Sequence, residues 1–365
     1  MRLFIILILL FIPLFIFRYK NSKPNFNPGD TVRITTRITA EPRINLNQQL
    51  VHPFGINVYL PRFPEYHYGD KLEIVGKVDK SEKGFYLKNP EARLLENHGF
   101  LPEIKRKMIS NFAKTLPQSE NALIAGITLG TKEGFTQEFY NSLKNAGVLH
   151  VVVASGTNVE LVSRVLISTL VLFVTRRLAI IGVLTGIWLY ALLVGLEAPI
   201  VRAAIMGSLV FTSQELGKVY FAWWGLFISA LTMLLVSPVW ITDIGFLLSF
   251  GATGGILAFE KPIKKIITGI TKSMATNGPV KIFINDFSTS LAAQVTAAPI
   301  LLFSFGQFSP WSPIVNALLL WTIAPIMALG FIGGILGLII EPLGKILIFL
   351  TYPLAWIFVK VVELF

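Results

Sequence analysis

The chain contains no cysteine and only four histidines. The lack of cysteine excludes disulfide bonds, thiolate metal sites and a cysteine nucleophile. No close set of Asp or Glu ligands surrounds a histidine, so we predict no metal site. No phosphate-binding P-loop is present either, which excludes ATP hydrolysis by that route. We therefore expect a protein without cofactors. The histidines are His52, His67, His98 and His150.

Charged residues are also scarce, at 15% of 365 residues, whereas 53% of the residues are hydrophobic. This balance is typical of a polytopic membrane protein and excludes an ordinary soluble domain. The net charge of +11 is consistent with basic cytoplasmic loops. It also favours a polyanionic ligand such as nucleic acid or anionic lipid.

The N-terminus carries an apolar run from Leu3 to Phe17, with Arg18 and Lys20 directly after it. Its length lies between that of a signal-peptide core and that of a full membrane span. No cleavage site of small residues follows the run. We therefore predict an uncleaved transmembrane anchor over residues 1–20.

Residues 26–97 differ in character, because they are polar, rich in β-branched residues and interrupted by turns. Alternating patterns predict strands at 31–38, 55–60 and 71–78, and a fourth strand begins at Gly84. Short strands punctuated by glycine and proline favour a small β-barrel of the OB type.

Basic and aromatic residues alternate in this β domain, a combination that binds single-stranded nucleic acid through stacking and charge. The alternative is ordinary, with the aromatic rings in the barrel core and the cations on a solvated surface. The candidate DNA contacts are Arg33, Arg37, Arg62, Tyr66, Tyr68, Lys77, Phe85 and Tyr86.

Residues 98–146 read as a linker with amphipathic helices near 104–116, 121–129 and 135–146. The first of these helices carries Lys105, Arg106 and Lys107 beside apolar positions, so we expect it at the membrane surface.

A helical membrane domain is predicted over 147–365. With the anchor, its apolar segments give about nine spans. If the N-terminus is inside and the β domain outside, the basic loops of this domain face the cytoplasm, as the positive-inside rule requires. The fold class is thus a polytopic α-helical membrane protein of the cytoplasmic membrane with a small N-terminal β-barrel. The expected segments are 148–175, 178–196, 199–217, 220–237, 240–259, 287–305, 312–338 and 343–363.

The first expected span contains a cluster of polar residues. Ser-Gly-Thr-Asn at 155–158 disfavours a continuous helix, and a break at membrane depth presents backbone groups to a passing solute. The alternative is a loop or re-entrant turn at the membrane surface. A serine nucleophile is not favoured, because the Gly-x-Ser-x-Gly motif and a triad are missing. The candidate path residues are His150, Ser155, Gly156, Thr157, Asn158, Glu160 and Arg164.

A second polar cluster consists of Glu197, Pro199 and Arg202. An arginine inside a span is costly unless it is paired, lines an aqueous path or reaches the surface. If a helix starts at Pro199, the Arg202 guanidinium and the helix dipole together favour a bound phosphate. The alternative is a structural ion pair between Glu197 and Arg202.

Two further polar residues complete the candidate path. Asp243 opens a span and is read first as a helix N-cap. Gln294 precedes Pro299 in the expected span 287–305, where a buried amide makes interhelical hydrogen bonds as often as it lines a path.

Several motifs together resemble the ComEC/Rec2 competence family over about residues 100–340. The longest is GVLHVVVASGTNV at 147–159, and shorter ones lie at 126–130, 195–204, 243–250, 294–299 and 305–309. The resemblance implies a channel that carries single-stranded DNA across the cytoplasmic membrane during natural transformation, with an OB-like domain before it. The partners it implies are single-stranded DNA, membrane lipids, a surface or periplasmic DNA receptor, a separate nuclease, a motor ATPase and a second copy of the chain.

This sequence departs from the family pattern in three ways. Asn158 stands where the family usually has histidine, and Leu247 where it often has glutamine. The metallo-β-lactamase-like domain of many members is missing from this sequence, so we expect a channel rather than a nuclease. Two alternatives stay open: a transporter of another anionic or lipid-linked solute, and a membrane enzyme using Ser155, Glu197 or Asp243.

Overall fold

The computed structural model divides the chain into two compact units. The first covers residues 1–106 and 231–241, and the second covers 107–230 and 242–365. The structure describes residues 11–20, 27–38, 42–44, 48–51, 56–66, 69–81, 84–88, 90–96, 99–153, 155–270 and 278–365.

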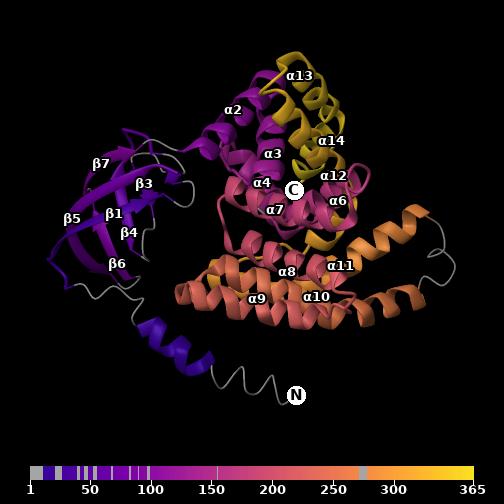
Figure 1. Cartoon of the computed structure of the whole chain (residues 1–365), viewed down its shortest axis with the longest axis horizontal. Helices are drawn as coiled ribbons and strands as arrows, with labels where there is room; N and C mark the ends of the chain where they lie inside the picture. Colours follow the sequence, from indigo (N-terminus) through magenta and orange to yellow (C-terminus); the bar gives the residue numbers. More distant parts are fainter. Residues whose placement is uncertain are drawn as a thin grey trace. The chain divides into compact units, whose positions relative to one another are not determined.

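The first unit contains a mixed sheet of seven strands (Figure 1). The strand order is β1-β5-β6-β4-β3-β2, and β7 also pairs with β5. The pair β4–β6 is parallel, and the other pairs are antiparallel. The strands are β1 (Thr31–Arg37), β2 (Arg43–Ile44), β3 (Gln48–Val51), β4 (Asn57–Pro61), β5 (Lys71–Ser81), β6 (Gly84–Lys88) and β7 (Glu91–Glu96).

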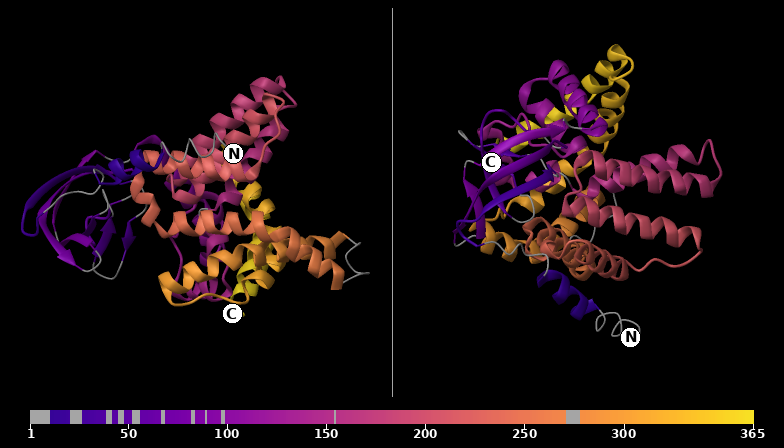
Figure 2. Two further views of the ribbon diagram at one scale, coloured as in Figure 1. Left: turned by 90° about the horizontal axis from the view of Figure 1, so that it is seen from below. Right: turned by 60° about the vertical axis from the view of Figure 1, so that its left-hand side comes forward.

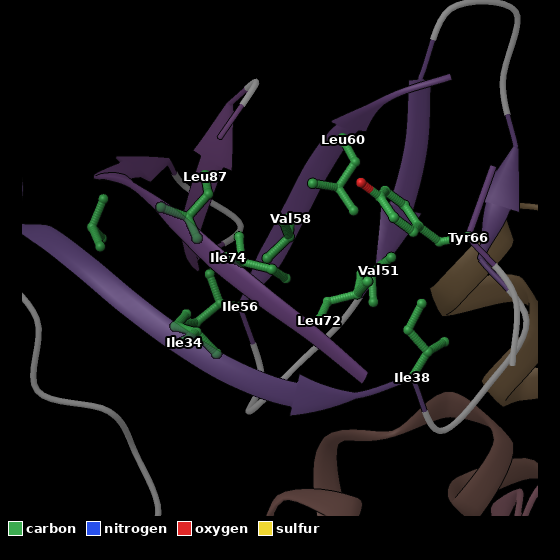
Figure 3. Packing of buried hydrophobic residues seen from close by; sticks show 11 residues of the cluster. Ile34, Ile38, Val51, Ile56, Val58, Leu60, Tyr66, Leu72, Ile74 and Leu87 are labelled. Carbon is green, nitrogen blue, oxygen red and sulfur yellow. The ribbon is translucent and has the colours of Figure 1, made fainter. Parts of the chain in front are cut away.

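Alternation along these strands builds one hydrophobic core, as expected for a sheet with one buried face. Ile34, Val58, Leu60, Leu72, Ile74 and Leu87 point into this core (Figure 3), and Val78 belongs to the same cluster. The four strands predicted from alternation are present as β1, β4, β5 and β6. Strands β2, β3 and β7 were not predicted. The structure shows a mixed sheet with a hydrophobic core. The strand order alone does not establish that the sheet closes into an OB-type barrel.

The N-terminal anchor is described only in part, because residues 1–10 of the predicted 1–20 lie outside the described residues. Residues 11–20 are helical. Phe11, Phe15 and Tyr19 stack on one another along this helix, and Arg18 donates a hydrogen bond to the Val236 carbonyl oxygen at 3.5 Å.

The rest of the described chain is helical. The three helices predicted in the linker are confirmed as α2, α3 and α4. The helices are α2 (Phe100–Thr115), α3 (Gln118–Leu129), α4 (Gln137–Ala146), α5 (Leu149–Val152), α6 (Gly156–Leu170), α7 (Arg176–Val194), α8 (Ala198–Glu215), α9 (Ala222–Val236), the 3₁₀ turn η2 (Pro238–Thr242), α10 (Ile244–Ile270), α11 (Gly278–Phe305), α12 (Ser312–Leu336), α13 (Glu341–Leu350) and α14 (Tyr352–Val362).

Five helical segments are long and apolar enough to cross a membrane: Leu149–Leu170, Arg176–Val194, Ile244–Gly269, Val280–Phe305 and Ser312–Leu336. The first combines α5 and α6 and runs over residue 154, which lies outside the described residues. The pair α13–α14, bent by 43°, adds a sixth if it counts as one span. These helices indicate a membrane protein with about five candidate spans in the described part of the chain, and the nine predicted spans are not confirmed. Helix α9 has 15 residues, about 22 Å at 1.5 Å per residue, which is short for a core of about 30 Å. Helix α8 has 18 residues, but its polar residues lower its mean hydropathy, so it is not among the five.

Helices α10 and α11 lie side by side as the longest pair of the second unit (Figure 2). Small residues bring their backbones together. A Cβ atom added to Gly255 would lie 2.6 Å from the Ala292 carbonyl oxygen, so only glycine fits there. The Thr296 hydroxyl crosses the same contact and donates to the Gly251 carbonyl oxygen at 2.7 Å.

Candidate functional site

The polar segment after His150 breaks the helix, as its composition predicts. Helix α5 ends at Val152, Ser155 has extended backbone angles, and α6 begins at Gly156. The Ser155 side chain does not cap the backbone of α6. Its hydroxyl instead donates to the Asn158 side-chain oxygen at 3.0 Å. The break therefore produces a new helix N-terminus inside the second unit.

Asn158 is fully buried at this break. Its amide nitrogen donates to the Ile127 carbonyl oxygen at 2.9 Å, and the Tyr190 hydroxyl donates to the neighbouring Thr128 carbonyl oxygen at 3.2 Å. Both carbonyls lie in the last turn of α3, where helical partners run out. Asn158 thus caps a helix end, and this contact joins α6 to α3.

Arg202 lies in the first turn and a half of α8, and its guanidinium is held on two sides. One terminal nitrogen, Nη1, donates to the Ser249 carbonyl oxygen of α10 at 2.7 Å. The other, Nη2, lies against Gly156 so closely that a Cβ atom there would be 2.6 Å away. Gly156 is therefore required by the position of the guanidinium at the start of α6.

The third nitrogen of Arg202, Nε, is buried and has no hydrogen-bond partner. Among the described residues, no ion pair joins Arg202 to a carboxylate. The predicted ion pair with Glu197 therefore does not neutralise this guanidinium. A half-buried cation with a buried Nε and no counter-charge in the described part of the chain is costly, so the arrangement suits an anionic ligand.

Tyr220 is a member of this site that sequence reasoning missed. It follows the end of α8, and its ring lies against Gly225 of α9, where a Cβ atom would be 2.6 Å from Cζ. Its hydroxyl is buried and lacks a hydrogen-bond partner. Tyr220 and Arg202 are close enough to interact electrostatically. A tyrosine near the end of an apolar segment is common at membrane interfaces, so the sequence gives no specific signal here.

The other predicted path residues lie elsewhere. Glu160 and Arg164 form an ion pair at 2.5 Å on the exposed side of α6, where Thr157 is also exposed. His150 is exposed on α5. The structure therefore does not bring these four side chains to Arg202.

Asp243 and Gln294 both make contacts of the structural kind that was considered for them beside a place in the path. The Asp243 carboxylate accepts from the Phe246 backbone amide at 2.7 Å, which makes it an N-terminal cap of α10. The Gln294 amide donates to the Ser309 carbonyl oxygen at 2.6 Å.

Most predicted contact residues of the β domain have structural partners. Tyr66 is buried and donates to the Ala92 carbonyl oxygen at 3.2 Å, and burial together with the Asp70 carboxylate raises its pKa. Phe85 packs against the core. Arg37 pairs with Glu96 at 2.9 Å and Arg33 with Glu73 at 3.6 Å. Tyr68 lies outside the described residues.

The remaining candidates, Arg62, Lys77 and Tyr86, reach the surface of the first unit. Lys77 and Arg62 are exposed, and the half-buried Tyr86 ring meets Tyr59 edge-on across the parallel strands. The Arg62 guanidinium lies 5.5 Å from the centre of the Phe63 ring, and Phe63 is 70% exposed. This cation–aromatic pair was not predicted, because Phe63 alone reads as a core residue.

Gln49 fixes the loop that carries Arg62 and Phe63. Its buried amide nitrogen lies within hydrogen-bond distance of the carbonyl oxygens of Pro61, Arg62 and Pro64, at 2.7 to 2.8 Å. Its oxygen accepts from the Tyr66 amide at 2.9 Å. One side chain thus holds the loop through main-chain atoms.

No group of three or more His, Asp or Glu side chains suited to a metal ion occurs in the part of the chain that the structure describes. The arrangement considered below as the candidate site consists of Arg202, Tyr220 and the start of α6.

Comparison with known proteins gives two matches. A family model described as "Competence protein" matches residues 127–365. The chain is 26% identical over 216 residues to ComE operon protein 3 of Bacillus subtilis (strain 168). This alignment covers 59% of the chain and 26% of that protein, so the chain spans only about a quarter of its relative. No solved structure matches. Because the family model covers well over half of the sequence, the chain belongs to the ComEC family of competence proteins.

Proposed function

We propose that this protein carries single-stranded DNA across the cytoplasmic membrane during natural transformation. Family membership supports a role in competence and DNA uptake. The transport step is our proposal, since the matched relative is far longer than the aligned region.

The observation that carries this proposal is the half-buried guanidinium of Arg202, whose Nε is buried and which has no carboxylate partner among the described residues. A strand of DNA brings one phosphate per nucleotide, each of which can offset that charge in turn. Among the described residues, the guanidinium donates to the Ser249 carbonyl oxygen and lies close to Gly156, and it forms no ion pair that a phosphate would have to break.

The β domain would make the first contact with the strand. Its exposed Arg62–Phe63 pair and the Tyr59–Tyr86 edge combine cations with aromatic rings, as proteins that bind single strands do. Within this proposal, the sheet closes as an OB-like barrel on the outer side of the membrane.

The proposed topology has about nine spans, with the N-terminus inside. Counting α8 and α9 as short spans places the basic residues at 176–177 and 218, the basic segment 261–281 and Lys345 on the cytoplasmic side. The Arg177–Glu215 ion pair, 2.9 Å long, links the ends of α7 and α8 and is consistent with both ends lying at one membrane surface.

We infer a channel rather than an enzyme. The Asp243 carboxylate caps α10 and the Ser155 hydroxyl bonds to Asn158, so neither is poised as a catalytic group. Strand degradation, capture of DNA and energy supply would then come from a separate nuclease, a surface or periplasmic receptor and a motor ATPase. Membrane lipids surround the channel, and assembly with a second copy belongs to the same proposal.

A second candidate is a transporter of another phosphorylated or lipid-linked solute. Arg202 favours it equally, because a guanidinium recognises phosphate and not the base attached to it. The two candidates differ in whether DNA enters the cell.

The test is entry of labelled DNA in a nuclease-protected form, in a transformable host with and without this gene. We expect entry to be lost while DNA binding at the cell surface persists. Unchanged entry would reject the DNA channel and leave the solute transporter.

A further inference from the structure

The two longest helices of the second unit, α10 and α11, exceed the thickness of a membrane. They have 27 and 28 residues, so each is about 40 Å long, against about 30 Å for a hydrocarbon core. In Figure 1 the end of α10 and the start of α11, both orange, project away from the other helices. Residues 261–269 and 280–284 form this projecting part, which we call the basic end of the pair.

A contact between the two helices shows where the basic end begins. The Thr289 hydroxyl donates to the Glu260 carboxylate at 2.9 Å, which places these two residues at the same level. The stretches from Ile244 to Glu260 and from Thr289 to Phe305 each rise about 25 Å. Because this length almost fills the hydrocarbon core, the next one or two turns of α10 lie at the depth of lipid headgroups.

The lysines of the basic end form no ion pair with a carboxylate of the described residues. Three of them are exposed, and Lys264 is half-buried. The carboxylates beside them along the chain, Glu260 and Asp286, are both half-buried. Lysines outnumber carboxylates here, so the basic end has an excess of positive charge that a partner can offset. The lysines are Lys261, Lys264, Lys265 and Lys281.

Aliphatic side chains lie between these lysines. Ile266 on α10 is 63% exposed, and Ile282 on α11 is 55% exposed. A helix end that combines lysines with exposed aliphatic groups suits an anionic bilayer surface, where the cations meet phosphates and the aliphatic groups enter the acyl boundary. Single-stranded nucleic acid is bound instead through exposed aromatic rings. Phe283, the exposed ring here, is already stacked on Phe287 with ring centres 6.2 Å apart.

We propose that the basic end binds anionic phospholipid headgroups at one surface of the membrane. The lysine ammonium groups contact the lipid phosphates, and Ile266 and Ile282 reach the adjoining acyl chains. This contact goes beyond the channel proposal and does not depend on which solute crosses the membrane. It holds the ends of α10 and α11 at a fixed depth in the bilayer.

The experiment uses the full chain carrying Ile266→Cys, labelled with one polarity-sensitive fluorophore. The label is unique because the chain has no cysteine. The protein is reconstituted into phosphatidylcholine vesicles with increasing amounts of phosphatidylglycerol. We expect added phosphatidylglycerol to shift the emission to shorter wavelength, because the label then enters a more apolar layer. The shift should shrink in about 1 M salt, where the Debye length is about 3 Å.

The decisive variant combines Lys261→Gln and Lys265→Gln in the labelled chain, and Lys77→Gln with Lys80→Gln is its matched control. Both variants lose two exposed lysines, but Lys77 and Lys80 lie on β5 in the first unit. One lysine near an anionic surface strengthens binding about fivefold. The decisive variant should therefore need at least about fivefold more phosphatidylglycerol for half of the shift. The control variant should respond as the labelled parent does.

Equal emission with and without phosphatidylglycerol would overturn the proposal, and so would equal responses of the two double variants. The labelled parent alone decides the first point, even if a lysine variant fails to fold. A larger shift with oligothymidylate in pure phosphatidylcholine than with phosphatidylglycerol would reject lipid as the occupant in favour of a nucleic acid strand. DNA entry into cells is measured separately, so a failure here leaves the test of the channel intact.

Discussion

The side chain of Asn158 on α6 donates a hydrogen bond to the Ile127 carbonyl oxygen at the end of α3, over 2.9 Å. The two residues are 31 positions apart, and Asn158 is fully buried. This bond places the start of α6, and with it Gly156, at a fixed position relative to α3. The guanidinium of Arg202 lies against that same start.

Replacing Asn158 by alanine should therefore destabilise the protein, because it leaves a buried carbonyl and the Ser155 hydroxyl without their partner. We expect a loss of about 1–3 kcal/mol in the free energy of unfolding. Asn158→His should recover part of it, since an imidazole N–H can donate to the same carbonyl. Denaturant unfolding in detergent measures both. Asn145→Ala, at an exposed site on α4, is the control and should change stability by less than about 0.5 kcal/mol.

Arg202→Ala should reduce entry of labelled DNA at least about tenfold at normal protein levels, because one charge-assisted contact to each phosphate is lost. Arg164→Ala provides a matched control, since Arg164 is an exposed arginine paired with Glu160. Its effect on entry should be small. Undiminished entry with Arg202→Ala would contradict a strand path at this site.

Gly255→Ala should force α10 and α11 apart, because the new Cβ would lie 2.6 Å from the Ala292 carbonyl oxygen. A close-packed interface accommodates such a group only by shifting, at about 1–3 kcal/mol. Gly269→Ala in the same helix meets nothing within 4 Å and should be neutral or slightly stabilising. Melting temperatures of the two variants compare them directly, and equal values would argue against tight contact at Gly255.

Phe63→Ala and Tyr86→Ala should weaken binding of a single-stranded oligonucleotide to the full chain, each by about 1–3 kcal/mol, if these rings stack on bases. Phe100→Ala is the control, because Phe100 is 77% exposed in the same unit and no cation of the described residues lies over its ring. Fluorescence anisotropy at several salt concentrations gives the affinities. Equal losses in all three variants would show that exposed rings act nonspecifically.

Glu96 provides a prediction for acid pH. Its hydrogen bond and charge interaction with Lys71, and its proximity to Arg37, hold the pKa of Glu96 below the usual 4.5. The lowered pKa means that this carboxylate stabilises the fold above about pH 4.5 and loses its effect as the pH falls through the folded-state value. Glu96→Gln should thus lower the melting temperature slightly at neutral pH, with the difference vanishing in strong acid. A constant difference at all pH values would contradict this.

The fold was predictable where one rule of patterning dominates. Alternation identified β1 and β5, because their buried residues form the core of a sheet with one solvated face. Long apolar segments likewise located the candidate membrane helices. The number of full spans could not be predicted from these segments. Helix α8 contains Arg202 beside apolar stretches. Its length alone therefore does not decide whether it crosses the membrane.

The candidate site was predictable only in part. Arg202 and Gly156 stood out because a cation and a helix break are unusual in apolar sequence. Tyr220 did not, since it lies in the irregular segment 218–221, which has no periodic pattern to mark it. Asn158 was grouped with the path residues by its polarity, whereas its contacts are with the end of α3. Burial and hydrogen bonding of a polar side chain depend on tertiary packing, which the sequence pattern does not contain.

The loop held by Gln49 has a practical consequence for topology. All four contacts of Gln49 go to main-chain atoms, so the side chain at position 63 can change without loss of the loop's support. Because the chain has no cysteine of its own, Phe63→Cys would introduce a unique thiol on an exposed turn. Its modification in intact cells by a reagent that cannot cross the membrane would report directly which side of the membrane the β domain occupies.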